Sequence, residues 1–132
     1  MTREAKGEFD VSIVPQTDRE VKGLNRMTID KQFRGELDAV TQGQMLSART
    51  DIPDSAGYVA MERVEGKLHG RKGSFVLQHT GTMNRGKSSL LITVVPDSGT
   101  GELGGLTGTL SINIVDRKHY YEFTYELPEM NS

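Results

Sequence analysis

YVAMERVEGKLHGRKGSFVLQHTGTM, residues 58–83, is the stretch that best defines the fold. Apolar and polar residues alternate on both sides of a central glycine, and this period of two is typical of half-buried β-strands. With Gly70 and Arg71 as the central pair of a tight hairpin turn, His69 faces Lys72. The two strands then match apolar face to apolar face, and a slip by one residue would break that match.

The register of this hairpin predicts which side chains meet across the two strands. On the apolar face the expected pairs are Leu68–Gly73, Gly66–Phe75, Val64–Leu77, Glu62–His79 and Ala60–Gly81. In this arrangement the ring of Phe75 covers the bare backbone of Gly66. Glu62 and His79 lie side by side among apolar neighbours, on the face that a closed sheet turns inward.

Two further turns divide the second half of the chain into strands. VDRK at 115–118 predicts a hairpin whose apolar faces match, with the expected pairs Ile114–His119, Ile112–Tyr121, Leu110–Phe123 and Gly108–Tyr125. NRGK at 84–87 predicts a turn with Gly86 in the left-handed conformation, followed by a strand over 88–95.

The first half of the chain alternates in the same way but carries weaker turn signals. The expected segments are strands at 9–13, 27–33 and 36–48, a polar connection at 15–23 and a loop at 50–57. The chain therefore holds about eight strands with one apolar and one polar face each. Because closing such a meander removes its exposed edges, we expect residues 1–132 to form one all-β domain, a closed antiparallel eight-stranded β-barrel.

GTGELGGLTGTL, residues 99–110, spaces Gly99, Gly101 and Gly104 as a dinucleotide-binding loop does. That fingerprint needs a helix directly after the glycines, within a βαβ unit. Here more glycines and a β-branched run follow, and these favour a strand. We therefore interpret the segment as a glycine-rich crossover between two strands and expect no nucleotide cofactor.

The composition excludes several kinds of function. The 132 residues carry a net charge of -2 with both signs scattered, so no continuous basic surface for nucleic acid is expected. The absence of cysteine excludes disulfides, thiolate metal sites and a cysteine nucleophile. The scattered histidines predict no metal site, and no cofactor is indicated. The charged N-terminus resembles no secretory signal and no stretch is long enough to span a membrane, which favours a cytoplasmic protein.

Three stretches carry a resemblance to known proteins: ERVEGKLHGRKGSFVLQHTGTM, GTGELGGLTGTLSI and HYYEFTYEL. They resemble a bacterial family of domain-of-unknown-function proteins over nearly the whole chain. The glycine segment is also similar to that of the allene oxide cyclase-like barrels, which include the plant dirigent proteins. This second resemblance implies an eight-stranded barrel with an internal pocket and, in the plant relatives, trimers that steer the cyclisation or coupling of largely apolar molecules. The catalytic positions of those enzymes cannot be placed on this sequence residue by residue, so their chemistry is not carried over.

Glu62 and His79 are the candidate catalytic residues. A carboxylate beside an imidazole in an apolar interior can act as an acid and a base, because burial and mutual charge shift both pKa values. The alternative is an ion pair that satisfies two buried polar groups without catalysis. The candidate ligand-binding residues face the same interior: Lys31, Tyr121, Tyr125, Phe75, Leu77 and Val64. Lys31 could instead extend to solvent, and the two tyrosines could instead pack in the core.

Two hypotheses about function follow. The first is that the barrel interior binds a small, mostly apolar molecule, with isomerase- or cyclase-like acid–base chemistry at Glu62 and His79 as an extension. The second is a barrel filled by its own side chains that acts through its outer surface as a structural or interaction protein, with a homo-oligomer as one form. An interior space beside Glu62 and His79 would favour the first hypothesis, and a filled lumen would favour the second.

Overall fold

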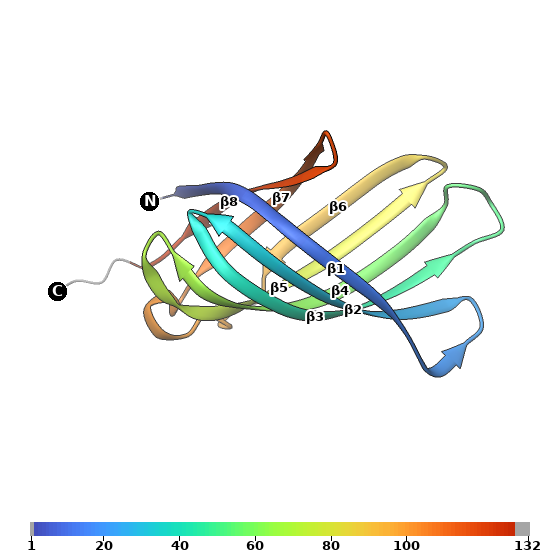
Figure 1. Ribbon diagram of the computed structural model, residues 1–132, viewed down its shortest axis with the longest axis horizontal. Helices are drawn as coiled ribbons and strands as arrows, with labels where there is room; N and C mark the ends of the chain where they lie inside the picture. Colours follow the sequence, from blue (N-terminus) through green and yellow to red (C-terminus); the bar gives the residue numbers. More distant parts are fainter. Residues whose placement is uncertain (1, 129–132) are drawn as a thin grey trace.

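A computed structural model describes residues 2–128, which form a closed antiparallel β-barrel of eight strands with one short 3-10 helix (Figure 1). Each strand pairs with the next along the chain, and β8 pairs with β1 to close the ring. The fold class predicted from the sequence is therefore confirmed. The elements are β1 (Arg3–Val21), β2 (Leu24–Gly35), β3 (Leu37–Arg49), β4 (Ala56–Leu68), β5 (Arg71–Asn84), β6 (Lys87–Val94), η1 (Gly101–Leu103), β7 (Thr107–Val115) and β8 (Lys118–Glu126).

The turn between β4 and β5 differs from the prediction. His69 and Gly70 form its central pair, with φ values of 47° and 78°, and Leu68 lies opposite Arg71. Two successive positive φ values give the turn the twist that flanking strands need, and glycine serves this purpose at the second central position. The predicted turn was therefore wrong by one residue, and every predicted pair across the hairpin was wrong by two.

The shift by two residues keeps each side chain on its predicted face but changes its partner. Gly66 lies opposite Gly73, and Phe75 lies opposite Val64, so the predicted cover of Gly66 by Phe75 is wrong. Both glycines are needed for close packing of backbone, and a Cβ on Gly66 would lie 2.2 Å from the Asp38 carbonyl oxygen of β3. A Cβ on Gly73 would lie 2.1 Å from the Thr100 carbonyl oxygen, so the crossover before β7 passes directly over this bare backbone.

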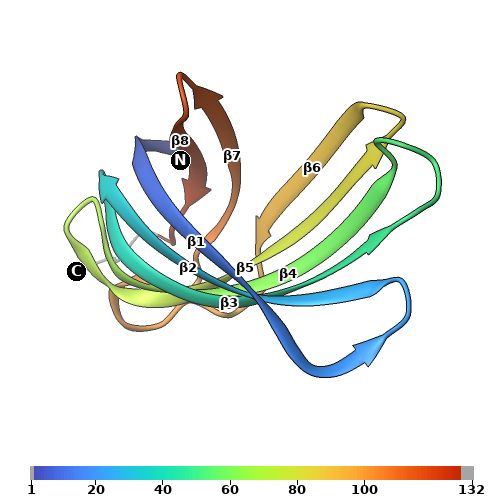
Figure 2. The same cartoon turned by 45° about the vertical axis from the view of Figure 1, so that its right-hand side comes forward.

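Other turns agree with the sequence analysis, with one exception near the N-terminus. Every predicted pair of the β7–β8 hairpin is present, and Gly86 has a φ of 90° in the β5–β6 turn. Residues 15–23 are not a polar connection, because β1 continues to Val21 and turns directly into β2. The end of β1 and the start of β2 form a two-stranded arm, which projects beyond the rest of the barrel (Figure 2).

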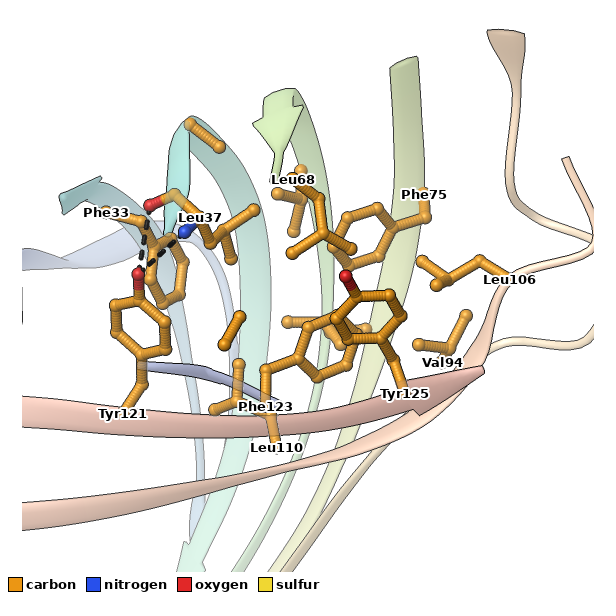
Figure 3. Close-up of a cluster of buried hydrophobic side chains, with 14 of the residues drawn as sticks. Phe33, Leu37, Leu68, Phe75, Val94, Leu106, Leu110, Tyr121, Phe123 and Tyr125 are labelled. Carbon is orange, nitrogen blue, oxygen red and sulfur yellow. Dashed lines mark hydrogen bonds between the residues drawn. The ribbon is translucent and has the colours of Figure 1, made fainter. Parts of the chain in front are cut away.

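One half of the barrel interior is filled by side chains. Figure 3 shows aromatic rings from β5 and β8 packed against one another, with the Phe33 ring of β2 beside Tyr121 of β8. The rings of Phe75 and Phe123 stack with centroids 5.7 Å apart, and Phe123 stacks on Tyr125 at 5.3 Å. These three side chains are at most 1% exposed. This half of the lumen is a packed hydrophobic core.

The glycine-rich crossover covers one end of this core. Leu103 and Leu106, each 1% exposed, point from it into the interior. Its backbone is joined to β5, because the Thr100 N–H donates to the Ser74 carbonyl oxygen at 2.8 Å. Its helical part is the three-residue η1, too short to supply a phosphate-binding dipole. No helix within residues 2–128 is long and apolar enough to cross a membrane.

Gly99→Ala is expected to lower the free energy of unfolding by about 1–3 kcal/mol. A Cβ at this position would lie 1.9 Å from the Leu103 carbonyl oxygen, so the crossover backbone would have to move. Urea denaturation measures the loss. The matched control is Gly104→Ala, whose Cβ would meet no atom nearer than 3.6 Å and which is expected to change stability by less than about 0.5 kcal/mol. Equal stability of the two variants would contradict this account of the crossover.

Candidate functional site

A cluster of four buried polar side chains lies inside the barrel, one from each of β2 to β5. The buried cluster consists of Lys31, Thr41, Glu62 and His79, all at most 9% exposed. Glu62 is its centre. Its Oε1 lies 3.2 Å from Lys31 Nζ and 2.8 Å from His79 Nε2, and its Oε2 accepts a hydrogen bond from the Thr41 hydroxyl at 2.6 Å.

Glu62 and His79 meet although they are not directly opposite in the sheet. Glu62 lies opposite Leu77, and His79 lies opposite Ala60. Both side chains face inward, and diagonal neighbours on one face of a sheet are within reach of long side chains. Space is also needed on the other side of Glu62, and it is provided by Gly43, where a Cβ would lie 2.9 Å from the Glu62 Cα.

The environment of Glu62 keeps its carboxyl group ionised. Burial alone would raise its pKa, but the hydrogen bond from His79, the charge of Lys31 and the hydrogen bond from Thr41 outweigh this effect. The pKa of Glu62 therefore lies below its usual value. Since both carboxylate oxygens are engaged and the side chain is fully buried, Glu62 has no atom that a ligand could touch.

Lys31 is held inside the barrel by two kinds of interaction. Its ammonium group contacts Glu62 and also lies 5.1 Å from the ring centroid of Phe9 and 5.8 Å from that of Phe33. Aromatic faces attract a cation, and the attraction is stronger when water is excluded. Lys31 thus points into the interior and does not extend to solvent.

The second ring nitrogen of His79, Nδ1, makes no hydrogen bond with the rest of the buried cluster. An ionised Glu62 accepts the N–H of Nε2, so in the neutral form of the ring Nδ1 is the nitrogen without a proton. Nδ1 has no hydrogen-bond partner among residues 2–128. In this part of the chain every fully buried polar side-chain atom has a hydrogen-bond partner. Nδ1 is therefore not fully enclosed by protein atoms, in spite of the low overall exposure of His79.

The half of the barrel beyond the buried cluster is open to solvent. β6 and β7 share only the pair Thr93–Thr109, and beyond it the two strands diverge (Figure 2). By strand alternation several apolar side chains point inward there, yet Ile13 is 49%, Leu90 43% and Ile114 61% exposed. We call the inward-facing side chains of this half the exposed inner surface: Ile13, Met27, Met45, Tyr58, Met83, Leu90 and Ile114.

Tyr58 is the polar member of this surface nearest to the buried cluster. Its ring covers Gly81, where a Cβ would lie 2.3 Å from the ring. Burial raises the pKa of its phenol, and the charge of Glu62 raises it further. The hydroxyl has no side-chain or backbone hydrogen-bond partner within residues 2–128. Tyr58 therefore offers a polar hydroxyl beside the apolar members of the exposed inner surface.

The other candidate residues from the sequence lie in the filled half. Val64, Phe75 and Leu77 are at most 1% exposed and pack in the core. The hydroxyl of Tyr121 accepts the Leu37 N–H at 2.9 Å and donates to backbone carbonyl oxygens (Figure 3). These contacts fasten β8 to the β2–β3 turn. A ligand-binding role for these residues stays a prediction.

Tyr125 takes part in a hydrogen-bonded chain at the same end of the barrel. Its hydroxyl bonds to Nδ1 of His69, and Nε2 of His69 lies 3.0 Å from Oε2 of Glu36. Glu36 also accepts the Lys6 N–H at 2.8 Å. The chain joins β8 to the β4–β5 and β2–β3 turns. The sequence analysis placed His69 next to the predicted turn and gave it no partner but Lys72, and only the tertiary fold brings Tyr125 and Glu36 to it.

Thr41 and Tyr58 are the members of the site that the sequence analysis missed. Both could have been found by counting in steps of two, since Thr41 follows Leu37 and Ala39 on the inner face and Tyr58 precedes Glu62 on it. A hollow of about 380 Å³ over β2, β3 and β4 touches the site, since Lys31 and Thr41 are among its lining residues. The largest hollow described, about 550 Å³, lies over β7, β8 and β1 and is lined mainly by polar side chains. Within residues 2–128 no three metal-ligating side chains are grouped.

These observations define a class of protein, a closed eight-stranded antiparallel β-barrel with an ionic cluster inside its lumen. Residues 5–125 match a family described as "Protein of unknown function (DUF3224)", and the chain belongs to this family. It is similar to a crystal structure of a DUF3224 protein of unknown function from Shewanella oneidensis, with 49% identity and a TM-score of 0.91, covering 98% of this chain and 100% of that chain. No curated protein matches the chain. The resemblance to the allene oxide cyclase-like barrels stays a prediction.

Proposed function

We propose that this protein binds a small, mostly apolar molecule on the exposed inner surface, beside His79. One observation carries the proposal: Ile13, Leu90 and Ile114 face the interior yet are 49%, 43% and 61% exposed. The inward-facing side chains of the other half are buried by one another. Exposed apolar surface costs about 25 cal/mol per Å² relative to buried surface, and a bound apolar molecule would recover that free energy.

The polar groups beside this surface favour a ligand whose polar end faces His79 and Tyr58. Nδ1 of His79 can accept a hydrogen bond, and the Tyr58 hydroxyl can donate or accept one. A few convergent polar groups on an apolar wall are typical of small-molecule sites. Met27 and Met45 lie opposite each other on the same wall, and methionine adapts to ligands of different shape. The ligand that fits best is an apolar molecule with a hydroxyl or carbonyl group at one end.

Acid–base chemistry is an extension of this proposal. Neutral His79 can take a proton at Nδ1 from an acidic C–H or O–H of the ligand, because the imidazolium that forms faces the ionised Glu62. Returning the proton to another atom of the ligand completes an isomerisation. Glu62 is then a positioning residue, since it orients the ring and does not touch the ligand.

The second hypothesis, an interaction barrel, is supported by apolar residues on the outer face. Leu46 and Val59 are directly opposite each other on β3 and β4, and they are 49% and 52% exposed. The experiment below separates the two faces of the sheet.

Ile13→Glu is expected to weaken the binding of an apolar probe by about tenfold or more, because a bound molecule would desolvate the new carboxylate. The probe is 1-anilinonaphthalene-8-sulfonate, followed by fluorescence and displaced by linear alcohols of increasing length. Each added methylene is expected to strengthen displacement by about fourfold, as burial of about 0.8 kcal/mol per methylene requires.

Val14→Glu is the matched control. Val14 is the next residue along β1, is 47% exposed and points to the outer face. It is expected to leave probe affinity within about twofold of the wild type, as surface substitutions do. A probe that binds Ile13→Glu and wild-type protein equally would overturn the proposal. Weaker binding to Val14→Glu alone would place the apolar site on the outer face.

A further inference from the structure

β6 has a free edge along most of its length. The Val95 N–H donates to the Val76 carbonyl oxygen of the β5 side at 2.9 Å, so odd-numbered residues of β6 direct their backbone groups toward β5. Because the direction alternates along a strand, the backbone N–H and C=O groups of Ser88 and Leu90 point away from β5. Thr93–Thr109 is the one pair with β7, and no other strand within residues 2–128 pairs with this edge. Figure 1 shows β6 standing apart from β7.

The edge also exposes apolar side chains on both of its faces. Leu90, on the inner face, is 43% exposed, and Leu91, on the outer face, is 56% exposed. Unpaired backbone groups together with such side chains are a template for another strand. Proteins usually protect an edge of this kind with a charge, a proline or a bulge. Between Ser88 and Val94, β6 contains none of these.

We propose that a second copy of this chain pairs with β6, antiparallel and across a two-fold axis. The free backbone N–H and C=O groups of Ser88 and Leu90 can be satisfied by another extended strand. β6 of a second copy is such a strand, and it presents the same uncharged sequence. Its only charge, Lys87, stands at one end of the strand. Antiparallel pairing about Ser89 sets Ser88 of each copy opposite Leu90 of the other and keeps the two lysines on opposite sides of the axis. Two-fold pairs also close on themselves and need no third copy.

The pairing buries Leu91 against its partner and extends the sheet from one barrel into the other. It does not depend on the proposed function. Leu90 belongs to the exposed inner surface, but the pairing uses its backbone groups, and the variants that test the pairing are at Ser88 and Leu91, outside that surface. The two proposals can therefore fail independently, and each has its own variants.

Analytical ultracentrifugation of the full chain, from about 1 μM to about 1 mM, tests the pairing in the range where small interfaces form. Two variants block the edge in different ways. Leu91→Lys places a charge on it, and Ser88→Pro removes an N–H that points to the free side and bonds to no neighbouring strand. Each is expected to raise the dimer dissociation constant by about tenfold or more.

Val59→Lys is the matched control, since Val59 is 52% exposed on the same outer face, two strands away on β4. It is expected to leave the dissociation constant unchanged. Amide exchange at Leu90 should slow as the wild-type protein is concentrated. A wild-type monomer at every concentration, a dimer that survives both edge variants, or equal weakening by Val59→Lys would each overturn the proposal.

Discussion

Glu62→Ala is expected to lower the free energy of unfolding by about 3–5 kcal/mol, because it leaves the ammonium group of Lys31 buried without its partner. Lys31 is held 3.2 Å from Glu62 and its side chain is only 6% exposed. The Thr41 hydroxyl and the His79 N–H lose their acceptor in the same variant. Urea denaturation followed by circular dichroism measures the loss.

A double variant tests whether the loss comes from the unpaired charge. Lys31→Met with Glu62→Met removes both charges at similar volume, and it is expected to be more stable than Glu62→Ala by at least about 2 kcal/mol. Stability against pH gives a second control. Because the pKa of Glu62 is lowered by folding, its stabilisation is present above the ordinary value of 4.5 and is lost as the pH falls through the folded value. The double variant should lose less stability in acid than wild type, and an unchanged acid profile would contradict the assignment.

Phe123→Ala is expected to cost about 3–5 kcal/mol, through a cavity at the centre of the filled half. Phe123 is fully buried between the rings of Phe75 and Tyr125, with which it stacks. The same denaturation experiment measures the effect. Phe123→Leu retains most of the volume and is expected to lose less than half as much, with the lost ring contacts contributing about 0.5–1.5 kcal/mol.

The binding of 1-anilinonaphthalene-8-sulfonate to folded Phe123→Leu is expected to equal that of the wild type. Phe123 belongs to the filled half, and the proposed site lies beyond the buried cluster. A stability loss of less than about 1 kcal/mol for Phe123→Ala would show that this half is not the packed core described above.

The candidate site was partly predictable from the sequence. Counting in steps of two placed Glu62 and His79 on the inner face, and the structure brings them within hydrogen-bond distance. The same counting could not show that Glu62 is enclosed by Lys31 and Thr41, since these come from other strands. Nor could it show that Nδ1 of His79 is the ring atom left free, because that depends on which partner occupies Nε2.

The alternation of apolar and polar residues was not sufficient to predict the register of β4 and β5. A hairpin with alternating faces looks the same after a shift of two residues, so alternation excluded a slip by one but left a slip by two. The turn chemistry at His69 and Gly70 selects the register, together with the crossover that must pass over Gly73. At VDRK the matching of apolar faces was sufficient, and every predicted pair is present.

The amino-acid sequence by itself determined that this chain forms an antiparallel barrel and which face of each strand points inward, because these depend on local alternation and on turns. Tertiary structure alone decided how far along the barrel the interior is filled. Phe75 and Ile114 both face inward, yet Phe75 is 1% exposed and Ile114 61%. The physical reason is that burial depends on which distant strands lie across the lumen, and beyond Thr93–Thr109 the strands β6 and β7 separate.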